Sequence, residues 1–248
     1  MKNIKKIQNQ EINFWKNSKD EKPSVWSIRK VLEKTSHGID FLDSLSQIAI
    51  LNSKKSFKVL EIGGGQGWAS CLLKSTYPKA HVTATDISSY AVASVHKWEE
   101  MFKVKVDNSY NCKSNETQEK DCSIDFIFTF AAAHHFITHR ETINEISRIL
   151  KKGGVAAYFC EPVTQLFWYP IAYKRVNRKR PEVHEDLLII SKLRSLAIKA
   201  GLEFSLIRTP SYNNRSGYIE TFYYLILSAF PFLQKFVPHT ATILFIKK

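Results

Sequence analysis

The first 55 residues carry their apolar side chains at helical spacing. Steps of three or four residues separate most of these positions, which are Ile28, Val31, Leu32, Ile39, Leu42, Leu45, Ile48 and Leu51. An α-helix brings residues at such steps onto one face, so that face is expected to be buried. The pattern therefore predicts that residues 1–55 form an N-terminal helical extension.

Beyond residue 55, short apolar runs alternate with segments of helical periodicity. The runs predict strands at residues 58–62, 81–85, 104–110, 124–130, 155–160, 202–208 and 240–246. The periodic segments predict helices at residues 68–75, 90–102, 142–150 and 185–200. Alternation at this rhythm favours parallel strands joined by right-handed crossovers. We expect an α/β fold: a Rossmann-like, doubly wound, mostly parallel sheet of seven strands with helices on both faces.

Two segments, residues 163–184 and 210–237, interrupt this alternation. They are rich in aromatic side chains, namely Trp168, Tyr169, Tyr173, Tyr212, Tyr218, Phe222, Tyr223 and Tyr224. They are expected to form a lid over a flat or apolar ligand, and the alternative is that these aromatics belong to the core. Residues 222–237 are too short to span a bilayer. A helix that caps the core is favoured for them over one that contacts a membrane surface.

The charge of the chain is strongly positive. Its 36 Lys and Arg against 23 Asp and Glu give a formal net charge of +13, which permits nucleic acid, anionic lipid or an acidic ligand as a partner. The lysines are spread along the chain, and the one dense run covers residues 174–180. A solvated face is the ordinary explanation of such a run, so charge alone does not make nucleic acid the expected partner.

The cysteines point to a reducing compartment. Cys71, Cys112, Cys122 and Cys160 are scattered and form no C-x-x-C pair, which argues against a disulfide framework or a zinc site. The first twenty residues are basic and amide-rich, unlike a signal peptide. We expect a cytoplasmic protein without a transmembrane segment.

The most informative string is Glu-Ile-Gly-Gly-Gly-Gln-Gly at residues 61–67, between a predicted strand and a predicted helix. Glycines there allow a tight turn and let the backbone approach a ligand. A dinucleotide motif would need a glycine at Trp68, and a phosphate loop would need a lysine that is absent. Asp86 ends the next strand, nineteen residues after Gly67, where a carboxylate can accept hydrogen bonds from a ribose.

This string resembles the first motif of class I S-adenosylmethionine-dependent methyltransferases. Residues 121–127 resemble the fourth-strand motif of that family, and residues 148–154 resemble the turn before its fifth strand. The resemblance covers roughly residues 55–165 and is closest to the small-molecule branch, which includes quinone and sterol methyltransferases. It implies one methyltransferase domain over residues 1–248, with a cofactor-binding half at 56–162 and an acceptor-side half at 163–248.

The resemblance also implies S-adenosyl-L-methionine as the cofactor and a set of residues to hold it. The glycines would shape the methionine side, Glu61 the turn, Asp86 the ribose site and Ile87 the adenine site. The family usually reads the adenine amine with an Asp after the third strand, and Asn111 and Cys112 stand there instead. The full expected set is Glu61, Gly63, Gly64, Gly65, Gly67, Asp86, Ile87, Asn111, Cys112 and Phe130.

Candidate catalytic residues follow the fourth predicted strand. His134 and His135 lie where ligands bind a parallel sheet, and His135 is the favoured base. The alternative is that both histidines only shape the pocket. Cys160 precedes Glu161 and Pro162, as a structural residue rather than a nucleophile.

We find no metal-ligand spacing, so metal-independent transfer to a small-molecule acceptor is expected. The alternatives left open are an RNA methyltransferase, a relative that uses the cofactor for cyclisation, and a protein that only binds it.

Overall fold

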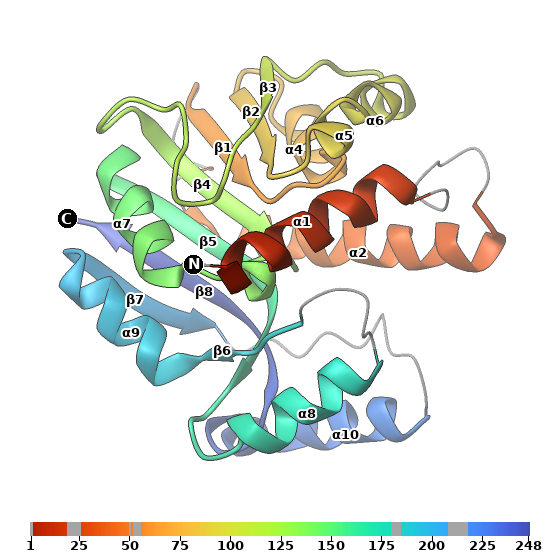
Figure 1. Cartoon of the computed structure of the whole chain (residues 1–248), viewed down its shortest axis with the longest axis vertical. Coiled ribbons are helices and arrows are strands. Elements are labelled where there is room, and N and C mark those ends of the chain that lie inside the picture. The colour runs from red at the N-terminus through yellow and green to blue at the C-terminus, as the bar shows by residue number, and fades with distance from the viewer. Residues whose placement is uncertain (1, 19–25, 50, 52–55, 180–184, 208–217) are drawn as a thin grey trace.

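Figure 1 shows the computed structural model, which describes residues 2–18, 26–49, 51, 56–179, 185–207 and 218–248. The described helices are α1 (Lys2–Asn17), α2 (Ile28–Ser46), α4 (Trp68–Thr76), α5 (Ser89–Val92), α6 (Val95–Phe102), α7 (His139–Ile149), α8 (Tyr169–Lys179), α9 (Ile190–Lys199) and α10 (Tyr218–Ala229), with 3-10 helices η2 (Ala133–His135) and η3 (Pro231–Lys235). No helix among these residues is both long enough and apolar enough to cross a membrane.

The strands are β1 (Lys58–Ile62), β2 (His81–Asp86), β3 (Asn108–Asn111), β4 (Ile124–Phe130), β5 (Leu150–Thr164), β6 (Leu188–Ile189), β7 (Leu202–Ile207) and β8 (His239–Lys247). They lie in the order β3-β2-β1-β4-β5-β8-β7, and β6 pairs with β5 off this path. Strands β1 to β5 are parallel, whereas β8 is antiparallel to both β5 and β7. The predicted Rossmann-like, mostly parallel sheet is confirmed, and the two-residue β6 adds an eighth strand.

Helices cover both faces of the sheet, as the doubly wound prediction requires. On one face Ile143, Ile146 and Leu193 from α7 and α9 pack against β1, β4 and β5. On the other face Phe41 of α2 and Leu73 of α4 pack with residues of α6 and the same strands. Strands β1 and β4 are therefore buried from both sides, which explains why their sequences are nearly continuous apolar runs.

Several element boundaries differ from the predictions. The helix expected at 185–200 begins only at Ile190, because Leu188 and Ile189 pair with the end of β5. The helix expected at 90–102 divides into α5 and α6, with Ser88 as the N-cap of α5. The strand expected to begin at residue 155 begins at Leu150, so that Gly153 and Gly154 lie within β5.

The apolar face predicted for the N-terminal extension is buried only in part. Leu45, Ile48 and Leu51 are at most 3% exposed, whereas Ile28 is 81% and Leu32 is 64% exposed. Only the carboxyl-terminal half of this stretch reaches the core, because α2 packs on α4 and β5 near Phe41. Helical spacing indicates which face of a helix is apolar, but it does not indicate how much of that face is covered by the rest of the protein.

The aromatic cluster around Phe41 is the core of this second face. Phe41 is fully buried, and its ring centroid lies 5.3 Å from that of Phe128 and 5.6 Å from that of Phe130. Trp68 and Phe159 complete the cluster at 5.8 Å each. These contacts join α2 to the helix and strands that carry the glycine turn.

Replacing Phe41 by Ala should therefore destabilise the fold strongly. Loss of a buried ring and the cavity that remains should lower the free energy of unfolding by about 3–5 kcal/mol. Urea unfolding followed by circular dichroism would measure this change. Phe222→Ala is the matched control, because its ring is 64% exposed and its removal should cost little. Equal effects of the two variants would contradict the assignment of Phe41 to the core.

Candidate active site

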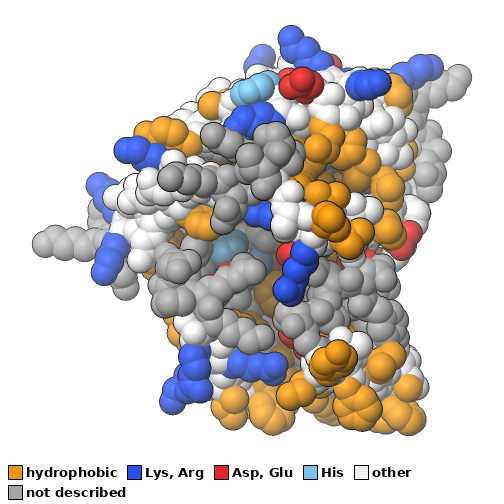
Figure 2. All heavy atoms as spheres, turned by 90° about the vertical axis from the view of Figure 1, so that its right-hand side faces the viewer, with side chains coloured by type: hydrophobic (Ala, Val, Ile, Leu, Met, Phe, Trp, Pro, Cys, Tyr) orange, Lys and Arg blue, Asp and Glu red, His pale blue; other side chains and the backbone are white. Residues whose placement is uncertain are grey.

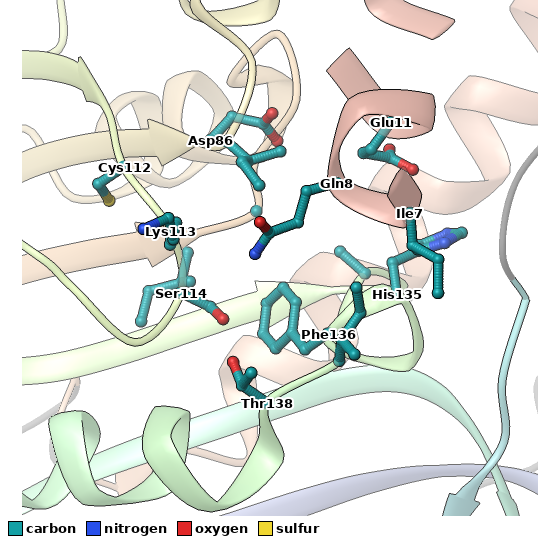
Figure 3. A pocket seen from close by; sticks show the side chains of 15 residues that line it. Ile7, Gln8, Glu11, Asp86, Cys112, Lys113, Ser114, His135, Phe136 and Thr138 are labelled. Atoms are coloured by element: carbon teal, nitrogen blue, oxygen red, sulfur yellow. The ribbon is translucent and has the colours of Figure 1, made fainter. Parts of the chain in front are cut away.

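A cavity lies at the carboxyl ends of β1, β2 and β4. This is the switch point of the sheet, since the chain adds β2 and β3 on one side of β1 and then β4 and β5 on its other side. It encloses about 660 Å³ of empty space, part of it open to solvent. Figure 3 shows side chains from three directions around it: the β2 and β3 ends, the loop after β4, and α1. Its lining residues are Ile7, Gln8, Glu11, Ile62, Gly63, Asp86, Ile87, Cys112, Lys113, Ser114, Ala132, His135, Phe136, Ile137 and Thr138.

The glycine string forms the turn that leaves β1 for α4. Gly63 and Gly65 have φ values of +70° and +56°, a left-handed conformation in which side chains are strained. A Cβ on Gly63 would lie 3.0 Å from the Phe136 ring, and one on Gly65 would lie 2.7 Å from the Trp15 ring. The turn thus needs glycine for its backbone, as the sequence predicted, and also for close packing against Phe136 and Trp15, which the sequence did not predict.

Glu61 lies beneath this turn rather than in the cavity. Its carboxylate is buried and accepts hydrogen bonds from the backbone N–H and the hydroxyl of Ser70 in α4. A Cβ on Gly64 would lie 2.5 Å from the same carboxyl group. Burial raises the pKa of Glu61 to about 7, against the opposing effect of the Ser70 hydrogen bonds. Glu61 therefore shapes the turn.

Asp86 lines the cavity at the end of β2. Its Oδ2 accepts a hydrogen bond of 2.8 Å from the Gly65 N–H, and its Oδ1 accepts one of 2.8 Å from the Ser88 N–H. Burial raises the pKa of Asp86 to about 6, although these backbone donors oppose the shift. The Ile87 N–H is a third backbone donor to this carboxylate, and a carboxylate has about four acceptor sites, so Asp86 retains room for a ligand hydroxyl.

Of the remaining residues that were expected to bind the cofactor, two line the cavity and two do not. Ile87 and Cys112 line the cavity beside Asp86. Asn111 pairs with Asp86 in the β2–β3 ladder but is exposed and does not line the cavity. Phe130 lies on the far side of the turn, where its ring packs 5.2 Å from that of Trp68.

The loop after β4 is held by Glu161, a fully buried residue of β5. Glu161 Oε1 accepts hydrogen bonds from the N–H groups of Ala132 and Ala133 at 2.9 and 2.7 Å. Its Oε2 lies 2.8 Å from His134 Nδ1 and accepts the His134 N–H at 3.2 Å. A bulge in β5 opposite β8, at Cys160, directs the Glu161 carboxylate beneath the loop.

The two histidines occupy different environments. His134 is buried between two carboxylates, with Nδ1 on Glu161 and Nε2 3.2 Å from Glu185 Oε2. Burial alone would lower the pKa of His134, but these ion pairs raise it to about 9, so its ring is an imidazolium at neutral pH. His135 is a lining residue of the cavity and lies beside Ile7 (Figure 3), with its ring centroid 4.2 Å from that of His134.

Helix α1 supplies a side of the cavity that the sequence did not suggest. Gln8 and Glu11 line the cavity, and the Gln8 side chain points into it (Figure 3). Burial and then the nearby Asp86 charge raise the pKa of Glu11 to about 7. Gln8, Glu11 and Trp15 lie at i, i+3 and i+7, which is one helical face. Only that spacing could have indicated from the sequence that this face of α1 reaches the ligand site. It did not do so, because the three residues are of mixed types, lie in a basic segment and match no motif.

The predicted lid does not line this cavity. None of its lining residues comes from the described parts of residues 163–184 and 210–237, and Tyr212 lies outside the described residues. Helices α8 and α10 lie together at the end of the molecule away from α6 (Figure 1). The described parts of the two aromatic segments therefore form a separate end of the protein.

One group of side chains among the described residues has the proximity of a metal site. His134, His135 and Glu185 each place a possible ligand atom within 4.8 Å of the others. Both ring nitrogens of His134 already lie against carboxylates. His134 and the carboxylates around it therefore form an ion-pair network. Residue spacing did not reveal the group, because Glu185 is distant from the two histidines in sequence.

Comparison with known proteins agrees with the sheet order and the glycine turn. Residues 60–158 match the family model described as a methyltransferase domain. A malonyl-[acyl-carrier protein] O-methyltransferase from Acetivibrio thermocellus is 27% identical over 116 residues, which are 47% of this chain and 40% of that relative. The match thus spans less than half the length of that curated relative.

Two solved structures have the same fold. Geranyl diphosphate C-methyltransferase from Streptomyces coelicolor superposes with a TM-score of 0.69 at 12% identity, covering 98% of both chains. The YcgJ protein from Bacillus subtilis gives a TM-score of 0.62 at 15% identity, covering 87% of this chain and 99% of that one. The sheet order and the glycine turn thus agree with the methyltransferase-domain match over residues 60–158, and the chain shares the fold of these two structures.

Proposed function

We propose that this chain transfers a methyl group from S-adenosylmethionine to a small-molecule acceptor, without a metal ion and in the reducing cytoplasm. One observation carries the proposal: a single cavity joins the glycine turn and Asp86 to the titratable groups Glu11 and His135. The first pair suits a nucleoside, and the second suits an acceptor that must be held or deprotonated. None of the four cysteines, which all lie in the described part of the chain, forms a disulfide, and this is compatible with that compartment.

The residues on the β2 side fit the cofactor. Gly63 borders the cavity without a Cβ, so a ligand can approach its backbone closely. Asp86 offers two buried carboxylate oxygens toward ribose hydroxyls, and Ile87 with Cys112 offers an apolar surface for adenine. We assign cofactor contact to these residues, and a supporting role in the turn to Glu61, Gly64 and Gly67. Asn111 and Phe130 have no cavity contact that supports their assignment.

Bound S-adenosylmethionine would supply an activated methyl group on a sulfonium centre. The protein's task is then to hold the acceptor in line with that methyl and to exclude competing nucleophiles. Gln8 and Phe136 extend into the cavity and can fix an acceptor between a polar and an apolar contact. Ile7, Phe136 and Ile137 make much of the acceptor side apolar, which favours an apolar or aromatic acceptor.

Asp86→Ala should weaken cofactor binding roughly tenfold or more, because charge-assisted hydrogen bonds to the ribose contribute about 1.5–3 kcal/mol. Titration calorimetry with S-adenosylhomocysteine would measure the affinity. Asp121→Ala is the matched control, since that carboxylate is 77% exposed and pairs only with Arg148 at the surface. Unchanged affinity in a folded Asp86→Ala protein would refute the ribose assignment.

If Glu11 rather than His135 deprotonates the acceptor, Glu11→Gln should remove the acidic limb of the pH profile of kcat/KM. With a pKa of about 7, Glu11 is ionised and able to accept a proton above pH 7, and activity should fall as pH drops below that value. The amide cannot accept the proton, so turnover should decrease roughly a hundredfold and lose this pH dependence. The exposed Glu100→Gln variant should keep the wild-type profile. A Glu11→Gln enzyme with an unaltered profile would exclude Glu11 as the base.

His135→Asn should leave cofactor affinity nearly intact, because His135 lines the acceptor side of the cavity. If His135 deprotonates the acceptor, turnover should fall roughly a hundredfold, whereas an orienting role gives a smaller loss. His96→Asn, at an exposed position of α6, is the control. A fully active His135→Asn enzyme would remove His135 from the mechanism, and activity lost with a chelator and restored by magnesium would refute metal independence.

A further inference from the structure

The end of the molecule formed by α8, α10 and η3 carries a large exposed apolar surface, which we name the apolar end. Figure 2 shows apolar side chains gathered along this lower edge, with Lys and Arg side chains beside them. Its exposed members are Leu166, Phe167, Ile171, Ile219, Phe222, Leu225, Ile226, Phe230, Phe232 and Phe236. Contiguous apolar patches of this extent on a protein surface mark a binding site.

Helix α10 has its apolar residues outward as well as inward. Ile219, Phe222 and Ile226, and Phe230 directly after the helix, follow steps of three and four and lie on the exposed side, with Ile219 85% and Phe222 64% exposed. The opposite side buries Tyr224 and Leu227. A helix that is apolar on both sides is expected where a second apolar medium covers the outer side.

Specific hydrogen bonds hold this surface in place. Trp168 Nε1 donates to the Phe236 carbonyl at 2.8 Å, and Gln165 Nε2 donates to the Lys235 carbonyl at 2.6 Å. The buried Gln234 donates to the Leu227 carbonyl at 3.1 Å and so ties η3 to α10. The apolar end is therefore a built surface, with its aromatic residues displayed by a hydrogen-bonded frame.

Cations border the apolar end. Lys174, Arg175 and Arg178 are exposed on α8. A neighbouring surface groove is lined by Arg194, Lys199 and Lys235 together with Leu166 and Ile198, and no acidic residue is among its described lining residues. The combination of exposed aromatic and aliphatic side chains with flanking cations complements an anionic lipid surface, where apolar groups enter the headgroup boundary and cations meet lipid phosphates.

We propose that the apolar end docks the protein on the surface of an anionic lipid bilayer. The described helices cannot span a membrane, so the contact is peripheral. The cations favour this occupant over a second copy of the chain, because two such ends would bring Lys174, Arg178 and Lys235 against their own equivalents. The proposal is independent of the acceptor and of methyl transfer.

Vesicle sedimentation would test the proposal. The full chain should bind vesicles of phosphatidylcholine and phosphatidylserine, bind pure phosphatidylcholine vesicles at least several-fold more weakly, and lose affinity as salt increases. Phe222→Ser with Phe232→Ser should weaken binding roughly tenfold or more. Lys174→Glu with Arg178→Glu should do the same and reduce the salt dependence.

Matched controls lie on the opposite end of the molecule. Met101→Ser removes a side chain that is 53% exposed on α6, and Lys105→Glu with Lys120→Glu makes the same change of charge at exposed positions. Both should bind vesicles like the wild type. All variants should keep cofactor affinity, because none of these residues lines the cavity.

Several outcomes would overturn the proposal. The first is equal vesicle binding by the apolar-end variants and the control variants. The second is absence of vesicle binding by the wild type. The third is a wild-type dimer that becomes a monomer in the Phe222→Ser, Phe232→Ser variant, when neither protein binds vesicles. Sedimentation velocity would detect the dimer. Quenching of Trp168 fluorescence by brominated lipids, lost in Trp168→Phe, would support insertion at this end.

Discussion

The buried carboxylate of Glu161 is the interaction on which the acceptor side of this protein depends. It has no exposed surface, and it would be costly to bury without the hydrogen bonds from Ala132, Ala133 and His134 and the charge of the His134 ring. Because each of these donors belongs to the loop after β4, satisfying the carboxylate fixes the shape of that loop. Burial of one charge thus determines where His135 and Phe136 stand in the cavity.

The same constraint explains two unusual backbone conformations. Ala131 and Cys160 have φ values of +49° and +55°, which residues with a Cβ seldom adopt. Ala131 follows the end of β4 and Cys160 lies within the neighbouring strand β5, and the Ala131 N–H donates to the Phe159 carbonyl at 2.9 Å. The bulge at Cys160 turns Glu161 toward the loop, and Ala131 turns the loop toward Glu161. Strain at two residues is offset by the hydrogen bonds that it makes possible.

The sequence was sufficient for the parts of the protein that are set by local rules. Strand runs such as residues 58–62 and 124–130, the glycine turn and the position of Asp86 follow from periodicity, glycine geometry and motif spacing. Contacts that depend on tertiary packing were not predictable in this way. No local signal places Glu11 of α1 beside Asp86, or brings Glu185 to His134 across 50 residues of chain. The end of α2 that fails to reach the core was missed for the same reason.

The position of His134 has a consequence for communication within the molecule. Its ring joins Glu161, beneath the cavity loop, to Glu185, and the Glu185 carbonyl accepts a 2.7 Å hydrogen bond from Asn177 of α8. A contiguous polar chain therefore connects the helix that borders the apolar end with the loop that faces the acceptor. Thermodynamic linkage makes any such coupling reciprocal. If a partner bound at α8 changed the affinity for the acceptor by some factor, the acceptor would change the affinity for that partner by the same factor. The imidazolium of His134 lies in the middle of this chain, so loss of its proton would weaken both of its ion pairs, with Glu161 and with Glu185, at once.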